Sequence, residues 1–175
     1  MTTLRTERLL LRKAEEGDLP AIHAILSDPR ATRFWSTPPH EVPERSLSWL
    51  RGMIAIDPAD GEDFIVELDG AVIGKAGFYE YPEIGFIFHP DHWGKGYAGE
   101  ALGAVLDRGF AFLASAFADV DPRNDACLKL LARLGFVETG RKEKTWLVGE
   151  EWCDSVYLSL DAQAWKASAA SRWLG

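Results

Sequence analysis

The sequence has few cysteines, no long apolar run and no excess of positive charge, and each shortage excludes a class of protein. Two cysteines in 175 residues are too few for a disulfide framework or a cysteine zinc site. No apolar stretch approaches the ~18 residues that a membrane span needs. The formal net charge of −8 argues against nucleic-acid binding, which uses a basic surface. We therefore expect neither a membrane nor a nucleic acid among its partners.

The sequence also lacks a secretion signal and the spacing of metal ligands, and its net negative charge has two explanations. The first ten residues, MTTLRTERLL, contain no signal-peptide core, so we expect a cytoplasmic protein. An acidic surface either keeps soluble proteins apart or suits cationic substrates such as amines and basic peptides, and both explanations stay open. No metal is expected, because metal-ligand spacing is missing among the four histidines, His23, His40, His89 and His92.

Length and composition indicate one globular domain. A chain of 175 residues that is 47% hydrophobic and 26% charged can bury a core without crosslinks. We place this domain at residues 1–165 and treat residues 166–175 as a C-terminal tail, either a frayed helix or disordered. The proline-rich segment 37–43 is interpreted as a loop within the domain.

Periodicity and turn residues predict a mixed fold. Asp69-Gly70 between two apolar runs predicts a β-hairpin. Asp18 is expected to cap one helix, and Asn124 and Gly135 are expected to bound another. The expected strands lie at 9–13, at two places within 63–81, at 83–90, at 116–120 and in a final hairpin over 136–160; the expected helices lie at 18–28, 45–56, 99–114 and 124–135. This order predicts an α/β (α+β) fold, a mixed and mostly antiparallel twisted sheet flanked by helices.

The segment HPDHWGKGYAGEAL, residues 89–102, places three glycines where a helix is about to begin. Glycine costs helix stability, so bare backbone here indicates a ligand that approaches main-chain N–H groups, usually a phosphate. Gly94, Gly96 and Gly99 also match the GxGxxG dinucleotide fingerprint, with Asp119 about twenty positions later. That fingerprint starts directly after a strand, whereas five residues separate Phe88 from the first glycine here. A tight loop required only by the fold stays open as an alternative.

Four segments in the same order resemble one family. PDHWGKGYAGEAL at 90–102 resembles the acetyl-CoA loop of the GNAT N-acetyltransferases, and is most similar to the branch that acetylates ribosomal-protein N-termini (RimJ/RimL-like). TERLLLR at 6–12, DPRNDACLKLLARLGF at 121–136 and GEEWCDSVYLSL at 149–160 resemble other segments of that branch. The resemblance implies the GNAT fold and an acetyl-CoA-dependent N-acetyltransferase that acts by direct attack in a ternary complex.

The acceptor implied is a primary amine, for example a protein N-terminal α-amine. A small-molecule N-acetyltransferase, of the polyamine or aminoglycoside type, is the alternative within the same fold. A non-catalytic acyl-CoA-binding sensor is an alternative of another class. The resemblance also leaves a homodimer open.

The resemblance implies a set of cosubstrate-binding residues. The strand at 86–88 would pair with the pantetheine arm, Asn124 would bond that arm as well as cap its helix, and the N–H of Phe88 would stabilise the oxyanion where the strand splays. Trp93 stands where the family often has glutamine or arginine, so it adds no charge. The predicted cosubstrate-binding residues are Phe86, Ile87, Phe88, Trp93, Gly94, Lys95, Gly96, Tyr97, Ala98, Gly99 and Asn124.

Acetyl transfer also needs a base for the ammonium and an acid for the departing thiolate. Glu83 is the first candidate for the base, and its rivals are the carboxylates of Glu100, Glu151 and Asp154. Many family members carry a tyrosine acid where this chain has Leu131. Cys127, one helical turn after Asn124, is the candidate acid, with simple core packing as its alternative.

Overall fold

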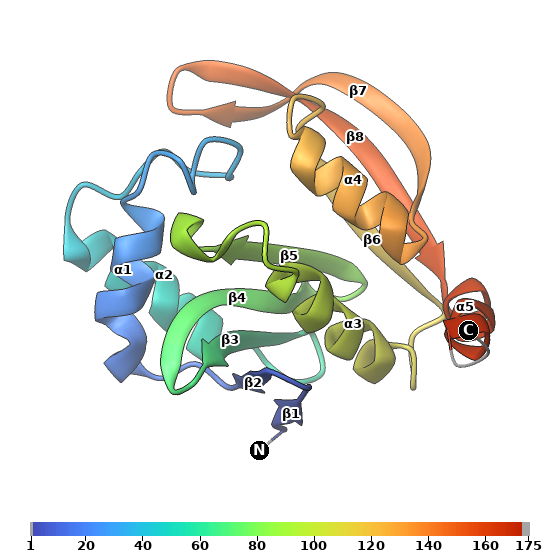
Figure 1. The fold of residues 1–175 in the computed structure, drawn as a ribbon. Helices are drawn as coiled ribbons and strands as arrows, with labels where there is room; N and C mark the ends of the chain where they lie inside the picture. The colour runs from blue at the N-terminus through green and yellow to red at the C-terminus, as the bar shows by residue number, and fades with distance from the viewer. Residues whose placement is uncertain (1, 173–175) are drawn as a thin grey trace.

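The computed structural model describes residues 2–172 and contains one eight-stranded sheet (Figure 1). The strand order is β1-β2-β3-β4-β5-β6-β8-β7, and among the described strands only β5 and β6 run parallel to each other. The strands are β1 (Leu4–Arg5), β2 (Leu9–Arg12), β3 (Glu62–Leu68), β4 (Ala71–Glu80), β5 (Glu83–Phe88), β6 (Ser115–Val120), β7 (Val137–Val148) and β8 (Glu151–Asp161). The predicted mixed, mostly antiparallel sheet is therefore confirmed.

Helices cover both faces of the sheet. One hydrophobic cluster joins the sheet to α3, α4 and α5, and a second, which includes Ile65 and Ile87, joins it to α1 and α2. The helices are α1 (Leu19–Leu26), α2 (Pro43–Ile54), α3 (Tyr97–Gly109), α4 (Asp125–Leu134) and α5 (Ala162–Arg172), with short 3-10 turns at Glu16–Asp18 and Pro90–His92. Each face of the sheet thus has its own core.

Three details differ from the sequence-based expectations. Asp18 does not cap α1 through its side chain; its carboxylate instead binds Arg12, with 2.6 Å between Arg12 Nη2 and Asp18 Oδ1. This partly buried ion pair and a hydrogen bond from the N–H of Glu15 use the carboxylate that a cap of α1 would otherwise need. Helix α3, expected over 99–114, begins two residues before Gly99 and ends at Gly109. The segment after residue 165, expected as a frayed helix or disordered, is helical to Arg172, and residues 173–175 lie outside the described part.

The two parallel strands diverge almost at once. Glu83 and Phe117 are the one register pair between β5 and β6, and the N–H of Phe117 donates to the carbonyl of Pro82 over 2.9 Å. Beyond that point β5 has a ladder partner only in β4, in the part of the chain that the structure describes. This splay leaves one edge of β5 without a strand, and α3 and α4 follow on either side of it (Figure 1).

The β7–β8 hairpin extends past the rest of the sheet. Strand β6 pairs with β8 only from Val156 to Asp161, so the hairpin tip pairs only with itself. In Figure 1 the tip arches toward the loop between α1 and α2. A Cβ added at Gly149 would lie 3.4 Å from Pro38 Cγ, so the tip contacts that loop. The hairpin therefore covers the far side of the splay.

Candidate functional site

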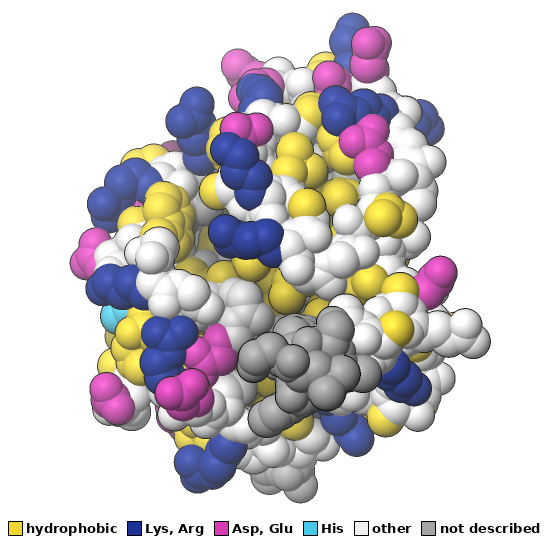
Figure 2. All heavy atoms as spheres, turned by 45° about the vertical axis from the view of Figure 1, so that its right-hand side comes forward, with side chains coloured by type: hydrophobic (Ala, Val, Ile, Leu, Met, Phe, Trp, Pro, Cys, Tyr) yellow, Lys and Arg dark blue, Asp and Glu magenta, His cyan; other side chains and the backbone are white. Residues whose placement is uncertain are grey.

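A cavity of about 1850 Å³ lies at the splay between β5 and β6. Its lining contains every residue predicted to bind the cosubstrate except Lys95, and both predicted catalytic residues, Glu83 and Cys127. The face shown in Figure 2 is hollowed, with hydrophobic side chains in the hollow and lysine and arginine side chains around it. Five lysine and arginine side chains line the cavity, together with seven carboxylates; the five are Arg30, Arg33, Lys75, Lys129 and Arg133. The lining therefore carries both signs of charge.

The glycine segment forms a turn whose N–H groups have no partner among the described residues. Gly94 and Gly96 have φ angles of +71° and +83°, which side chains rarely adopt, and a Cβ at Gly94 would meet no atom within 4 Å. Within the described residues, no carbonyl or side chain accepts from the N–H groups of 94–99. Helix α3, 13 residues long, begins here and adds its positive end. Such a helix start binds phosphate groups well.

Side chains on both sides hold this turn in place. Arg8 donates from Nη1 to the carbonyl of Lys95 over 3.1 Å and lies over the Tyr97 ring, and its Nε is 2.7 Å from Glu100 Oε2. Lys95 itself turns away from the cavity, because its Nζ donates to the carbonyl of Asp91 over 2.9 Å. The phosphate-binding capacity of the turn therefore comes from its backbone.

The free edge of β5 presents main-chain groups to the cavity. The N–H of His89 donates to the carbonyl of Ile73 on β4. Because N–H directions alternate along a strand, the N–H groups of Phe86 and Phe88 point the other way, toward the splay. The indole Nε1 of Trp93 donates to the carbonyl of Phe88 over 3.0 Å, which fixes the tryptophan beside this edge.

Asn124 and Cys127 lie across the cavity at the start of α4. Asn124 Oδ1 accepts from the N–H of Cys127 over 3.2 Å, so the predicted helix cap is confirmed. Its amide nitrogen has no partner among the described residues. Burial raises the pKa of the Cys127 thiol to about 12. A thiol that holds its proton so firmly is a poor acid, which weakens the expectation that Cys127 protonates the leaving group.

Glu83 is half-buried at the point where β5 and β6 separate. Burial raises the pKa of its carboxyl, a hydrogen bond from the Tyr79 hydroxyl opposes that rise, and the nearby carboxylates of Asp119 and Glu80 add to it. The indole Nε1 of Trp146 donates to Asp119 Oδ2 over 2.9 Å. A carboxylate with a raised pKa, in a cavity, is suited to accepting a proton near neutral pH.

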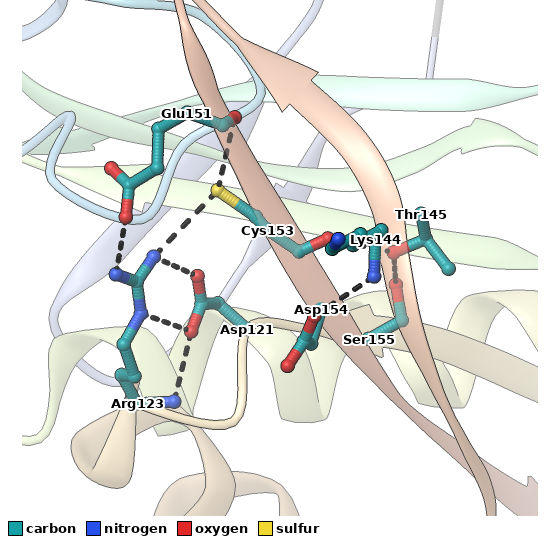
Figure 3. Close-up of polar contacts among 8 residues, drawn as sticks. All are labelled: Asp121, Arg123, Lys144, Thr145, Glu151, Cys153, Asp154 and Ser155. Atoms are coloured by element: carbon teal, nitrogen blue, oxygen red, sulfur yellow. Dashed lines mark hydrogen bonds and ion pairs between the residues drawn. The ribbon is translucent and has the colours of Figure 1, made fainter.

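The rival carboxylates are engaged elsewhere (Figure 3). Glu151 Oε1 is 2.6 Å from Arg123 Nη1, and Arg123 also binds Asp121 with two nitrogens. Asp154 Oδ1 accepts from the N–H of Lys144 over 2.8 Å. Hydrogen bonds from Thr6 and Arg8 outweigh burial and hold the pKa of Glu100 below its usual value. These groups position the loop and the hairpin, and Glu83 is left as the candidate base.

Sequence reasoning missed a buried ion pair beside Glu83. Lys75 Nζ is 2.9 Å from Asp63 Oδ2, and each side chain is only 2% exposed. The pair lines the cavity next to Trp35, whose indole N–H has no partner among the described residues. A lysine within the apolar run AVIGKAGF was the available signal, because an unpaired lysine is almost never fully buried.

Two kinds of site do not occur in the described part of the chain. None of its helices has the length and apolar character needed to cross a bilayer. No group of three or more metal-ligating side chains is close enough together there to hold an ion.

Comparisons with known proteins identify the family of the chain. A family model described as the acetyltransferase (GNAT) domain matches residues 8–137. The uncharacterized N-acetyltransferase p20 of Bacillus licheniformis is 35% identical over 155 residues, which are 80% of this chain and 85% of that protein. Spermidine N(1)-acetyltransferase of Escherichia coli K12 is 27% identical over 161 residues, covering 86% of this chain and 84% of that protein. Spermidine N-acetyltransferase from Vibrio cholerae, solved with CoA and spermine, has a TM-score of 0.78 at 24% identity over 92% of this chain and 99% of that one.

The ribosomal-protein branch receives less support than the family as a whole. A ribosomal L7/L12 α-N-protein acetyltransferase, solved with coenzyme A, superposes with a TM-score of 0.81 over 93% of this chain and 99% of that chain. Its sequence identity is only 16%, so this likeness shows the fold alone. Other acetyltransferases are more similar in sequence, and the branch predicted from the motifs is therefore not established.

Proposed function

Because this chain belongs to the GNAT acetyltransferase family, we propose that it transfers the acetyl group of acetyl-CoA to a primary amine by direct attack in a ternary complex. Family membership makes it an acetyltransferase, as its sequence predicts. The observation that supports the cosubstrate best is the row of N–H groups over 94–99 at the start of α3, which have no acceptor within residues 2–172. That row fits a diphosphate, and the free edge of β5 next to it fits an extended amide-bearing arm.

Different residues along the cavity would bind different parts of the cosubstrate. The backbone of 94–99 would hold the diphosphate, and the N–H and carbonyl of Phe86 would pair with the arm. The amide nitrogen of Asn124 would bond the arm from the opposite wall. The N–H of Phe88 would donate to the carbonyl oxygen as negative charge develops on it. One such donor contributes about 2.7–4 kcal/mol to the transition state.

Glu83 would take a proton from the acceptor ammonium, directly or through one water, and leave a neutral amine to attack. An α-amine has a pKa of ~7.7–8.0 and a lysine-type amine ~10.4, so an α-amine needs less help. No protein acid is required for the departing thiolate, because a thiol with a pKa of ~8.5 leaves readily and takes its proton from water. The acid role of Cys127 stays a prediction from the sequence.

The acceptor half of the cavity suits a cationic amine. Glu83 and Asp119 lie on neighbouring strands with aromatic side chains around them, and aromatic faces attract cations. Those aromatic residues are Trp35, Trp49, Tyr79 and Trp146. Polyamines and basic protein N-termini both meet this description; one relative is named for spermidine, and one protein of the same fold is named for the α-amine of ribosomal L7/L12.

The test is a measurement of CoA release with acetyl-CoA and a panel of amines that includes spermidine, an aminoglycoside and N-terminal peptides. Turnover with any amine, lost in Glu83→Gln while calorimetric CoA binding is kept, supports the proposal. Tight CoA binding without turnover on the whole panel would support the sensor alternative. Because Glu83 must be ionised, kcat/KM should rise with pH through its raised pKa and then level off.

A further inference from the structure

Strand β4 carries one residue more than β5 at the end nearest the site. Phe78 pairs with Ile84 and Glu80 pairs with Glu83, so Tyr79 is the extra residue of a β-bulge. A bulge bends the strand and re-aims the side chain of the inserted residue. Here it brings Tyr79 beside Glu83 in the cavity lining, within reach of a hydrogen bond from the tyrosine hydroxyl to the carboxylate.

A glycine on β5 makes room for this arrangement. A Cβ added at Gly85 would lie 3.2 Å from Tyr79 Cδ1 and 3.3 Å from Lys75 Nζ, closer than most real Cβ contacts. Both side chains from β4 therefore lie across the bare backbone of β5. Because Gly85 is two residues from Glu83 on the same strand, the tyrosine ring lies on the same face as the carboxylate.

The buried ammonium of Lys75 also restricts the movement of the Tyr79 ring. Lys75 Nζ donates to Asp63 Oδ2 over 2.9 Å and to the carbonyl of Gly85 over 3.2 Å. It lies 6.0 Å from the centre of the Tyr79 ring and 5.5 Å from that of Trp35. The lysine is buried and held by two acceptors, so the ring beside it has little freedom to turn away from Glu83.

We propose that Tyr79 is a positioning residue for the acetyl transfer: its hydroxyl holds the Glu83 carboxylate toward the acceptor and keeps it ionised until the acceptor arrives. This inference rests on the proposed function, in which Glu83 is the base. The ammonium proton passes to the Glu83 carboxylate and then to solvent, and the tyrosine keeps its own proton throughout. Tyr79 contacts the base and not the reacting atoms.

The charged and titratable groups that face Glu83 decide in which direction its pKa moves when the tyrosine hydroxyl is lost. Tyr79 and Glu80 approach from β4, and Asp119 approaches from β6. Burial and the two carboxylates raise the pKa of Glu83, whereas the bond from Tyr79 lowers it. Lys75, further along β4, is occupied by Asp63. Loss of the tyrosine hydroxyl should therefore raise the pKa of Glu83 still further and leave less of the base ionised near neutral pH.

The test compares the pH profiles of kcat/KM for the wild type and for Tyr79→Phe. We expect the acidic limb to move upward by roughly 0.5–1 pH unit, the size of one hydrogen bond expressed as a pKa difference, while the Kd for CoA stays unchanged. Tyr157→Phe is the matched control. Tyr157 stacks on Phe117 with 5.8 Å between ring centres and lies outside the cavity lining, so its profile should match the wild type.

A second variant covers the case in which Tyr79→Phe does not fold. In Gly85→Ala the added methyl group would crowd the Tyr79 ring and Lys75 Nζ and displace the tyrosine from Glu83. The acidic limb should therefore move in the same direction as in Tyr79→Phe. An unmoved limb in a folded, active variant would overturn this inference. If the wild type turns over with an amine, and Glu83→Gln loses that turnover while it still binds CoA, the proposed function stands whatever Tyr79→Phe does. Absence of turnover with every amine would instead count against the proposed function.

Discussion

Trp146 Nε1 donates a hydrogen bond to Asp119 Oδ2 over 2.9 Å, and this bond fastens the tip of the β7–β8 hairpin to strand β6. The two residues lie 27 positions apart, on strands that do not pair at this point. A second attachment holds the tip to the loop after β6, where Arg123 binds Glu151. These two attachments, together with the contact at Pro38, decide how the hairpin covers the acceptor half of the cavity.

Replacement of Trp146 by phenylalanine should weaken acceptor binding. A phenyl ring replaces the indole and the N–H donor is lost, so the hairpin tip loses one attachment worth about 1 kcal/mol. We expect the KM of the acceptor to rise roughly fivefold and the Kd of CoA to stay constant. Steady-state kinetics and calorimetry measure the two. Trp152→Phe is the control, because Trp152 lies on the same hairpin, is 54% exposed and is outside the cavity lining. Equal effects of the two variants would contradict this role for the bond.

Gly94→Ala tests the phosphate turn. The φ of +71° strains any side chain, and the open space before Gly94 is where a ligand would approach. We expect the Kd of CoA to rise at least about tenfold with a loss of stability of about 1 kcal/mol. Gly70→Ala is matched to it, since Gly70 has a φ of +82°, the same open surroundings and a place in the β3–β4 turn outside the cavity lining. The control should lose similar stability and keep its affinity, and a common loss of affinity would mean that strain alone is responsible.

Local sequence signals predicted much of the fold because turn and cap residues mark where several of its elements begin and end. Asp69-Gly70 marks the β3–β4 hairpin through residues that tolerate positive φ, and Asn124 and Gly135 bound α4 through capping chemistry. A turn with exposed backbone at 94–99 was predicted for the same reason, because the conformational freedom of glycine acts on its own part of the chain. Whether those glycines and the candidate base act as predicted is left to the experiments above.

The partners of the site were harder to predict because they meet only in the folded sheet. The contact of Trp146 with Asp119, and the bulge that turns Tyr79 toward Glu83, depend on strand register that no local pattern shows. The expected cap at Asp18 failed for a similar reason, because Arg12 on a neighbouring strand competes for its carboxylate.

Cys127→Ala distinguishes the acid expected from the sequence from a packed thiol. Loss of a general acid lowers turnover by about 10²–10⁴-fold. The burial that raises the thiol pKa to about 12 favours the packing alternative, so we expect kcat to fall by less than about threefold. The measurement is kcat with saturating acetyl-CoA and acceptor, with the Kd of CoA as a check on the site. A fall of two orders of magnitude at unchanged affinity would restore the acid role.

The Lys75–Asp63 pair should respond oppositely to removal of one partner and of both. Both side chains are 2% exposed, so Asp63→Asn leaves the ammonium of Lys75 buried without a counter-ion. Breaking such a pair costs about 3–5 kcal/mol, whereas exchange of both members for well-fitting neutral groups is often neutral or stabilising. We therefore expect Asp63→Asn to lower the free energy of unfolding by several kcal/mol, measured by urea denaturation, and Asp63→Asn with Lys75→Met to recover most of that loss. Because Lys75 also supports Tyr79, the double variant should stay less active than its stability suggests. A double variant as unstable as Asp63→Asn alone would mean that the ion pair, and not the buried charge left behind, is what the fold requires.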